Sequence, residues 1–353
     1  MIRIGFLMRD MLCSTIYDKA RVKSILIIRM NRIGDMIYTL PVIRTLKKEF
    51  PFAKITVLAE PANAEVASTE AAVDEVLVYR KGRGLFHNRY SRIALLLGAR
   101  RFDLAVSVKG GFSSFFALIA AISGARYRIG YRSSSGHILD KLYNLPADPI
   151  DFSRTHQLDA CLHLLSPLGI GEHIRDISLR IPNTFLEKAS AFFCKKGIEH
   201  RDNVIIMNIS SNRAASAWSP ERFVALGRAL SEESGCFSIV CSSPDEAQQA
   251  RDVSGRIGEN SYYYQTESPL AFAAAASLCS VLVSGDGGAS HLAAAVGTPV
   301  VALFGKTSPG IWRPHGEMNI VLQAEQGGVE AIPVKNVLAA ILSAGLLIKK
   351  VKD

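Results

Sequence analysis

The sequence predicts an α/β protein with two doubly wound parallel sheets, one in each half of the chain. Short apolar runs rich in β-branched residues alternate with stretches of helical periodicity, which is typical of βαβ units. The alternation stops between Gly169 and Asn183 and then starts again. A chain of 353 residues is long enough for two domains that each bury a core of their own.

The composition indicates a folded protein of the cytoplasm. Hydrophobic residues make up 48% of the chain and charged residues 21%, which argues against long disordered segments. The six cysteines form no C-x-x-C pair, so we expect reduced thiols in the core. The apolar stretch Val337–Ile348 is too short to span a bilayer, and Ile4–Met8 is too short for the core of a signal peptide.

A first domain is expected over residues 24–170, after an N-terminal extension over residues 1–23. Its first strand is the apolar run Ser24–Ile28, and Pro51 closes the helix that follows. Further strands are expected at Lys54–Ala59, Glu75–Tyr79, Asp103–Val108 and Tyr127–Tyr131. Further helices are expected at Leu85–Gly98, Phe112–Ile122 and His156–Leu168.

A second domain is expected over residues 184–330. The segment Gly169–Asn183 before it contains Gly, Pro and charged residues without periodicity, so it is the predicted linker. Residues 331–353 are expected to form a helix, Val334–Leu347, and a tail. The expected strands are Val204–Ile209, Phe237–Cys241, Val281–Ser284 and Pro299–Phe304. The expected helices are Thr184–Lys196, Pro220–Glu233, Asp245–Ile257, Leu270–Leu278 and Ala289–Val296.

A glycine-rich turn, residues 285–288, joins the strand Val281–Ser284 to a helix in the second domain. Its three glycines would let a ligand approach the backbone closely. The N–H groups of Ala289, Ser290 and His291 point out of the helix N-terminus, where the helix dipole favours an anion such as a diphosphate. Asp286, within the turn, is expected to cap the helix or to accept hydrogen bonds from the loop or a sugar hydroxyl. A plain βαβ turn with a capped helix is the alternative.

The first domain carries polar residues directly after its first strand. They are Arg29, Asn31, Arg32 and Asp35. Side chains at the carboxyl ends of parallel strands lie where α/β proteins bind their ligands. Asp35 has two interpretations that the spacing leaves open. It is either the cap of the next helix or a general base tuned by an apolar wall and the nearby arginines.

The positive charge of the chain is confined to its first half. Residues 1–170 contain 24 Lys and Arg against 14 Asp and Glu, whereas residues 171–353 contain 17 against 18. This asymmetry indicates an anionic partner for the first domain, either nucleic acid, a phosphorylated glycolipid or a membrane surface, or else a solubilising basic surface.

Three segments together resemble glycosyltransferase family 9, the ADP-heptose:lipopolysaccharide heptosyltransferases. Residues 28–51 (I-R-M-N-R-I-G-D-M-I-Y-T-L-P-V-I-R-T-L-K-K-E-F-P) are similar to the family's N-terminal signature. Residues 284–309 (S-G-D-G-G-A-S-H-L-A-A-A-V-G-T-P-V-V-A-L-F-G-K-T-S-P) are similar to its C-terminal signature. The segment W-S-P-E-R-F at 218–223 is a weaker match. The resemblance covers residues 24–330.

The resemblance implies a GT-B fold, in which two Rossmann-like domains face each other across a cleft. The first would bind the acceptor and the second the nucleotide sugar, in an inverting single displacement. Asp35 falls on the family's proposed general base. The positions that would contact the donor are Ser210, Ser211, Asp286, Gly287, Gly288, Ser290 and His291. The family's phosphate-binding Lys is replaced by Ser216, so Arg213 or Lys306 is expected to supply the missing charge.

The expected reaction is transfer of a heptose from ADP-heptose to the inner core of lipopolysaccharide. Basic residues of the first domain are expected to bind that anionic acceptor: Arg32, Lys109, Arg126, Arg128 and Arg132. No D-x-D pattern or other metal site is evident, so we expect metal-independent transfer without a cofactor. The expected location is cytoplasmic, with peripheral contact on the inner membrane.

Other functions compete with this interpretation. One alternative is a family member that uses another nucleotide sugar or glycan acceptor. Another is a degenerate GT-B protein that binds a nucleotide or glycan without catalysis, and Ser216 in place of the family's Lys supports this alternative. A nucleotide-sugar epimerase would share the fold. Nucleic-acid binding lacks a recognised motif. A dehydrogenase is disfavoured because neither half has G-x-G-x-x-G after its first strand.

Overall fold

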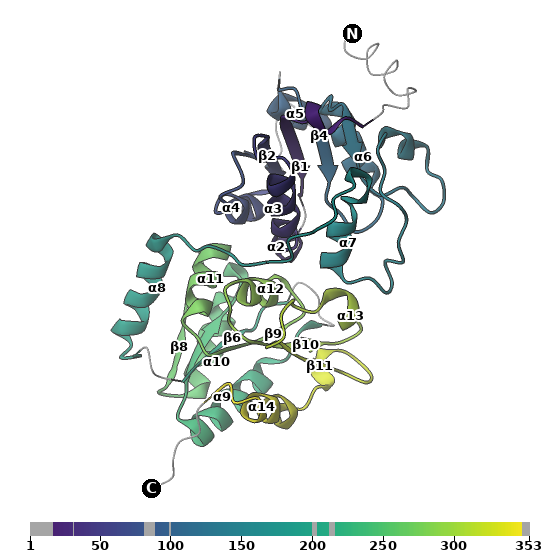
Figure 1. The fold of residues 1–353 in the computed structure, drawn as a ribbon. Coiled ribbons are helices and arrows are strands. Elements are labelled where there is room, and N and C mark those ends of the chain that lie inside the picture. Colours follow the sequence, from purple (N-terminus) through teal and green to yellow (C-terminus); the bar gives the residue numbers. More distant parts are fainter. Residues whose placement is uncertain are drawn as a thin grey trace. The chain divides into compact units, whose positions relative to one another are not determined.

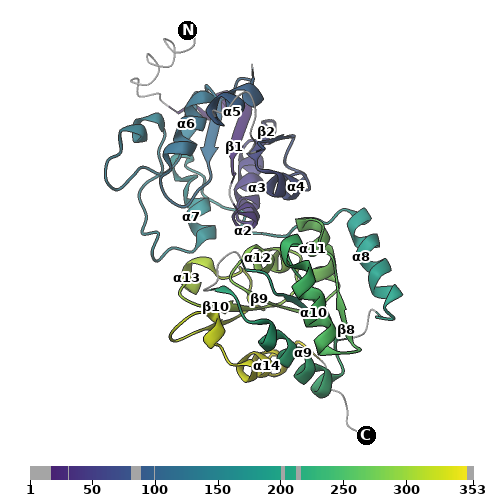
Figure 2. The same ribbon diagram turned by 180° about the vertical axis from the view of Figure 1, so that it is seen from behind.

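The computed structural model describes residues 17–30, 32–80, 89–98, 100–199, 203–211 and 216–347. The chain divides into two compact units, the first ending at Ile177 and the second beginning at Ser178. Each unit contains one parallel β-sheet with helices packed on it (Figures 1 and 2). The predicted α/β class, with one parallel sheet in each half, is confirmed.

The first unit has five strands in the order β3-β2-β1-β4-β5. The strands are β1 (Ser24–Ile28), β2 (Lys54–Ala59), β3 (Glu75–Val78), β4 (Leu104–Ser107) and β5 (Tyr127–Ile129). The helices are α2 (Ile33–Ile37), α3 (Leu40–Glu49), α4 (Pro61–Ala67), α5 (Arg89–Leu97), α6 (Ser114–Ile122) and α7 (Gln157–His163). Every pair is parallel, and β1 lies between β2 and β4. The strand order therefore reverses between β1 and β4.

The second unit has six strands in the order β11-β10-β9-β6-β7-β8. The strands are β6 (Val204–Asn208), β7 (Phe237–Cys241), β8 (Ser261–Tyr263), β9 (Val281–Gly285), β10 (Val300–Phe304) and β11 (Ile320–Gln323). The helices are α8 (Asn183–Lys195), α9 (Pro220–Ser234), α10 (Ala247–Ile257), α11 (Pro269–Ser277), α12 (Gly288–Ala295), α13 (Pro309–Trp312) and α14 (Val334–Ser343). Here the order reverses between β6 and β9.

The two faces of the first sheet are buried by different helices. Leu26 and Ile28 of β1 belong to a core cluster that also contains Ile93 of α5 and Phe116 of α6. Side chains alternate along a strand, so the intervening residues of β1 point to the opposite face. The 3-10 helix η2 (Ile138–Leu142) packs beside α6 on the first of these faces.

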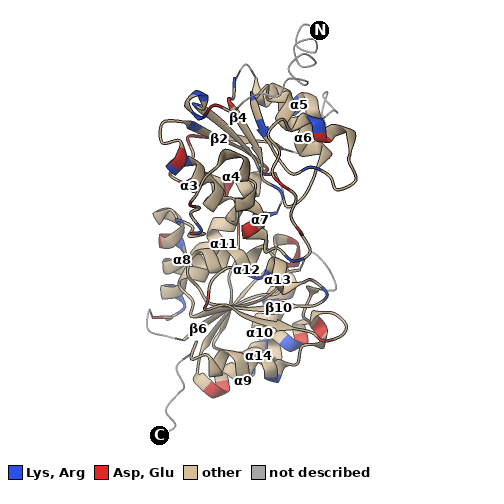
Figure 3. Ribbon diagram, turned by 45° about the vertical axis from the view of Figure 1, so that its right-hand side comes forward, with Lys and Arg blue, Asp and Glu red and all other residues tan. Residues whose placement is uncertain are grey.

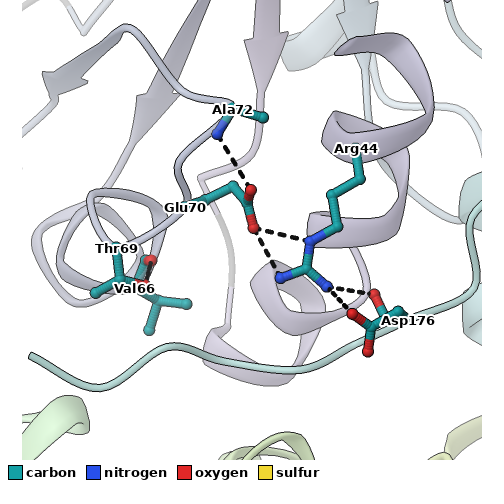
Figure 4. Close-up of polar contacts among 6 residues, drawn as sticks. All are labelled: Arg44, Val66, Thr69, Glu70, Ala72 and Asp176. Atoms are coloured by element: carbon teal, nitrogen blue, oxygen red, sulfur yellow. Dashed lines mark hydrogen bonds and ion pairs between the residues drawn. The ribbon is translucent and has the colours of Figure 1, made fainter. Parts of the chain in front are cut away.

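The residues before the unit boundary are fastened to helix α3 (Figure 4). The Arg44 guanidinium contacts the Glu70 carboxylate at 2.8 Å and 2.9 Å, and its Nη1 donates to the carbonyl and carboxylate of Asp176 at 2.7 Å and 2.9 Å. The next residue of α3 also takes part, because Thr45 Oγ1 accepts from the N–H of Ile174 at 3.0 Å. The predicted linker therefore follows α3 up to Asp176. In the second unit, the N–H of Leu179 donates to Ala295 O at 2.7 Å.

Several element boundaries differ from the expectations. The predicted helix His156–Leu168 ends as α7 at His163, and a short 3-10 turn, Ser166–Leu168, follows it. Pro167 lacks the N–H that a continued helix would need. Among the described residues, no helix is both long and apolar enough to cross a bilayer.

Candidate functional site

Asp35 lies at the carboxyl edge of the first sheet, beside the point where the strand order reverses. It is in the first turn of α2, which follows β1. Lys109 follows β4, the strand that pairs with β1 through Ile28 and Ser107. Open α/β sheets bind ligands in the crevice at such a switch point. The two residues are thus brought to one edge by the sheet topology.

A buried arginine holds the Asp35 carboxylate. Arg29 Nη2 lies 2.8 Å from Asp35 Oδ1, and the Arg29 side chain is 1% exposed whereas that of Asp35 is 14% exposed. Arg29 Nη1 donates to the carbonyl of Val108, which fixes the guanidinium between the ends of β1 and β4. The Asp35 carboxylate is therefore held in place at a position that solvent still reaches.

The surroundings of this ion pair are tightly packed. Helix α7 contributes Cys161, whose pKa is raised to about 11 by burial and is influenced by Arg29 and Asp35. Gln157 of α7 contacts the Cys161 sulfur at 3.7 Å, and its side-chain amide lies where a Cβ on Gly110 would have to go. A side chain at Gly110 would therefore force the Gln157 amide to move.

The arginines and the lysine expected to bind the acceptor fall into three groups. Arg32 and Arg132 are exposed near the carboxyl edge, where Lys109 is half-buried with its Nζ 5.8 Å from the centre of the Phe116 ring. Arg126 is exposed at the opposite edge, because it precedes β5 and its N–H bonds to Phe102 O. The structure therefore does not bring Arg126 together with Asp35.

Arg128 has a structural set of contacts. It is 7% exposed, and its guanidinium donates to Leu142 O at 2.6 Å and to Ala125 O at 2.8 Å. These bonds tie β5 to the segments on either side of it. The contacts account for the buried charge without a ligand.

The glycine-rich turn of the second unit also lies at a switch point. It joins β9 to α12, and β9 pairs with β6 where the strand order reverses. None of its glycines has a positive φ. Gly285 is instead required by space, because a Cβ there would overlap the backbone carbonyl of Ser216. Close approach of a backbone carbonyl, and not a positive φ, is thus what requires a glycine at position 285.

The first turn of α12 carries the expected donors. Gly287 is the N-cap and supplies no side-chain cap, so the backbone N–H groups of this turn are not capped by it. Ser290 and His291 are buried, and Ser290 Oγ donates to Gly285 O at 3.2 Å. Asp286 is half-buried, and its N–H bonds to Leu303 O at 3.1 Å, which fastens the turn to β10.

The other predicted donor contacts lie at neighbouring strand ends. Ser210 follows β6, and its Oγ accepts from Ser243 N at 2.6 Å, linking the ends of β6 and β7. Ser211 is next to it and half-buried, and Lys306 is exposed after β10. Helices α11 and α12 contain no Lys, Arg, Asp or Glu (Figure 3). Arg213 lies outside the described residues.

The W-S-P-E-R-F segment holds the fold together. Trp218 Nε1 donates to Ile332 O at 3.0 Å, and Arg222 Nε bonds to Glu330 at 2.8 Å. Burial would raise the pKa of Glu330, but the hydrogen bonds from Arg222 and Ser219 outweigh it and lower the pKa. This segment therefore clamps residues 330–332 onto the start of α9.

Sequence reasoning named Arg29 in the first loop without listing it as a site residue. The available signal was an arginine directly after a fully apolar strand, a position that becomes buried when β4 packs alongside. Within the described ranges, no group of three or more His, Cys, Asp and Glu side chains could hold a metal ion.

Comparison with known proteins places this geometry in context. The family model for glycosyltransferase family 9 (heptosyltransferase) matches residues 91–331. Lipopolysaccharide heptosyltransferase 3 of Escherichia coli is 26% identical over 313 residues, which cover 86% of this chain and 88% of that protein. Lipooligosaccharide heptosyltransferase 2 of Haemophilus ducreyi is 26% identical over 324 residues, covering 86% and 90%.

Solved structures share the fold. A glycosyltransferase family 9 crystal structure from Veillonella parvula superposes with a TM-score of 0.81 at 21% identity, covering 91% of this chain and 97% of that one. The E. coli heptosyltransferase WaaC with ADP gives a TM-score of 0.74 at 18% identity, covering 91% and 100%. The chain thus has the fold of these enzymes over nearly its whole length.

Proposed function

The chain belongs to glycosyltransferase family 9 (heptosyltransferase), and we propose that it transfers a heptose from ADP-heptose to the inner core of lipopolysaccharide. It is a glycosyltransferase, and its relatives are named as lipopolysaccharide heptosyltransferases. The E. coli heptosyltransferase WaaC, which has the same fold, was solved once with ADP and once with ADP-2-deoxy-2-fluoro heptose. The observation that carries the proposal is the ion pair Arg29–Asp35 at the switch point of the first sheet.

In this proposal Asp35 is the general base of an inverting displacement. It removes the proton from the acceptor hydroxyl as the hydroxyl attacks the anomeric carbon, so the C–O bond to the acceptor forms while the bond to the diphosphate breaks. The 2.8 Å ion pair with Arg29 supports this role because it fixes the position of the carboxylate. The 14% exposure of Asp35 leaves it accessible to an acceptor.

The second unit binds the donor in this proposal. Positive charge develops on the sugar in the transition state, and negative charge develops on the leaving diphosphate. The N-terminal turn of α12, with Ser290 and His291, stabilises that diphosphate through backbone and side-chain donors. Gly287 and Gly288 leave the ligand room beside this turn, Asp286 contacts the sugar, and Ser210 and Ser211 line the neighbouring strand end. Lys306 or Arg213 adds the charge that α12 lacks, and no metal ion takes part.

The first unit binds the acceptor. Arg32, Lys109 and Arg132 are proposed contacts for its phosphates and carboxylates, because they lie around the carboxyl edge that carries Asp35. Arg126, at the opposite edge, and Arg128, whose guanidinium is taken up by backbone carbonyls, are left out of this proposal. Since lipopolysaccharide is a membrane glycolipid, the protein would work in contact with the cytoplasmic face of the inner membrane.

The test combines transfer and binding measurements on the same variants. Asp35→Asn should abolish transfer from ADP-heptose while ADP binding, measured by calorimetry, stays within about twofold of wild type. Asp252→Asn, on the exposed surface of α10, is the matched carboxylate control and should keep full turnover. Undiminished transfer by Asp35→Asn would refute the base assignment.

The donor is tested separately. Thermal-shift measurements with ADP, UDP, GDP and CMP should give a shift with ADP. A shift with UDP and none with ADP would overturn the ADP-heptose proposal. Nucleotide binding by the wild type without any transfer would instead favour a non-catalytic binding protein. The sequence feature behind this alternative is Ser216, which stands in place of the family's Lys.

A further inference from the structure

One outer surface of the first unit is apolar where a water-exposed surface is expected to be polar. It is formed by α5, α6 and η2 on one face of the sheet. Helix α6 packs beside α5 on one side and beside η2 on the other, and Figure 1 labels the two helices. We call this outer surface the apolar–basic surface. Its apolar members are exposed or half-buried side chains of these three elements: Leu95, Phe115, Leu118, Ile122 and Ile138.

The spacing of these residues gives them one orientation. In α5 the buried residues are Ile93 and Leu97, so Leu95 between them points away from the core and is 75% exposed. In η2, Ile138 is 76% exposed while Leu142 is buried. A single exposed side chain of this size is common, but several that lie beside one another mark an interaction surface.

Helix α6 lies between α5 and η2 and adds a stripe of half-buried apolar side chains. Phe115, Leu118 and Ile122 recur at helical spacing, and the residues between them are buried against the sheet. The helix contains no charged residue at all. Contacts at both sides make the surface continuous, because the Tyr90 and Phe115 rings are 5.6 Å apart and the Phe112 and His137 rings are 5.2 Å apart.

The charges around this surface are positive. Exposed or half-buried basic side chains flank it on α5 and η2: Arg89, Arg92 and Lys141. Helix α5 has no acidic residue, and from Leu104 to Leu142 the only acidic residue is Asp140. Asp140 is 7% exposed and accepts the N–H of Ser133 at 2.9 Å, so it presents little negative charge outward.

We infer that the apolar–basic surface docks on an anionic lipid bilayer. Exposed leucine and isoleucine side chains insert among acyl chains, while arginine and lysine stems reach back to the headgroups. The absence of exposed acid from α5, α6 and η2 fits a uniformly negative partner, since a protein partner would need no such uniformity. The inference rests on the part of the proposed function that brings the protein to a membrane, and it names the surface that does so.

The test measures co-sedimentation with vesicles that contain no lipopolysaccharide, so acceptor recognition does not contribute. Wild type should bind vesicles of phosphatidylcholine mixed with phosphatidylglycerol and not vesicles of phosphatidylcholine alone. Leu95→Glu with Ile138→Glu should weaken binding by about tenfold or more, because two apolar side chains no longer leave water. Arg92→Gln with Lys141→Gln, which keeps the apolar residues, should weaken it as well.

Matched controls keep the result interpretable. Phe52→Glu removes an exposed apolar side chain, 97% exposed, from the turn before β2, and Met318→Glu removes one from the second unit. Both should bind vesicles as wild type does. Unaltered thermal unfolding shows that the exposed substitutions leave the fold intact.

Two outcomes would overturn the inference. Unchanged vesicle binding by Leu95→Glu with Ile138→Glu would exclude this surface as the docking site. A wild-type dimer that this variant converts to a monomer, seen by light scattering, would assign the surface to a second copy of the chain. Heptose transfer to a water-soluble acceptor should be unaffected by Leu95→Glu with Ile138→Glu. Absence of this transfer would count against the proposed function and not against the docking surface.

Discussion

Replacing Arg29 by methionine should destabilise the first unit through the carboxylate it leaves behind. Methionine has a similar length and fills much of the same space, so the main change is loss of the guanidinium. Asp35 would then keep its carboxylate with no counter-charge at 2.8 Å. Asp35→Asn in the same protein removes that carboxylate and should restore part of the stability.

The size of the effect follows from burial. At 2.8 Å and an effective dielectric constant of about 20, the Coulomb attraction is on the order of 6 kcal/mol, and desolvation of the buried guanidinium offsets part of it. Breaking a buried pair by removing one partner costs roughly 3–5 kcal/mol. Because Asp35 keeps 14% exposure, we expect the lower end, about 3 kcal/mol, for Arg29→Met. The double variant Arg29→Met with Asp35→Asn should lose about 2 kcal/mol less stability than the sum of the losses of the two single variants.

The assay is urea unfolding, because guanidinium chloride would weaken ion pairs itself. Both tryptophans, Trp218 and Trp312, belong to the second unit. Tryptophan fluorescence therefore follows the second unit, whereas far-UV circular dichroism follows both. Arg29→Met should move the circular dichroism transition to lower urea. If the units unfold independently, the fluorescence transition should stay in place.

An exposed pair in the same unit provides the control cycle. Arg100 and Glu75 are each 41% exposed, so their coupling should be at most about 1 kcal/mol. A coupling for Arg29 and Asp35 no larger than that of the exposed pair would refute the reasoning, since burial would then add nothing to the interaction.

Three further predictions concern the second unit and the cysteines. Gly285→Ala should cost on the order of 1–3 kcal/mol through overlap with a backbone carbonyl and should weaken ADP binding. In helix α10, the new Cβ of Gly255→Ala would lie in open space, so this variant should raise the free energy of unfolding by about 0.5–1 kcal/mol. Equal effects of the two glycine substitutions on the unfolding curves would contradict this. The lowered pKa of Glu330 stabilises the folded protein at pH values above the ordinary pKa of a carboxyl group. This stabilisation is lost as the pH falls through the pKa of Glu330 in the folded state. The stability gap between wild type and Glu330→Gln should therefore close on acidification, and a gap independent of pH would argue against the hydrogen bonds. Alkylation at neutral pH, followed by mass spectrometry, should label the exposed Cys194. Cys161 is buried and its pKa is about 11, so it should stay unlabelled until the protein unfolds. Early labelling of Cys161 would show that helix α7 opens.

Local patterns were enough to predict strands that have a neighbour on each side. Ser24–Ile28 and Phe237–Cys241 are the observed bounds of β1 and β7, because a buried parallel strand is a continuous apolar run. The outer strands β8 and β11 were not expected. They are short and partly polar, and pairing with β7 and β10 rather than composition makes them strands.

The sites depended on contacts that no local pattern contains. The loop positions of Asp35 and the α12 turn follow from strand–loop–helix order alone. The reason for Gly285 is a carbonyl at Ser216, distant along the chain. In the same way, Arg128 resembles the other basic residues of its segment until the carbonyls of Leu142 and Ala125 are seen around it.

Burial of the Arg29–Asp35 pair also separates two kinds of electrostatics in one protein. Added salt shortens the reach of charges in water, to about 3 Å at 1 M, but acts far less on groups shielded from solvent. The pair at the carboxyl edge, with Arg29 at 1% exposure, should keep its geometry in concentrated salt, whereas attraction between exposed arginines and lipid headgroups should fade. Ionic strength then offers a way to detach the protein from vesicles while its ion pair, and any chemistry that depends on it, stays intact.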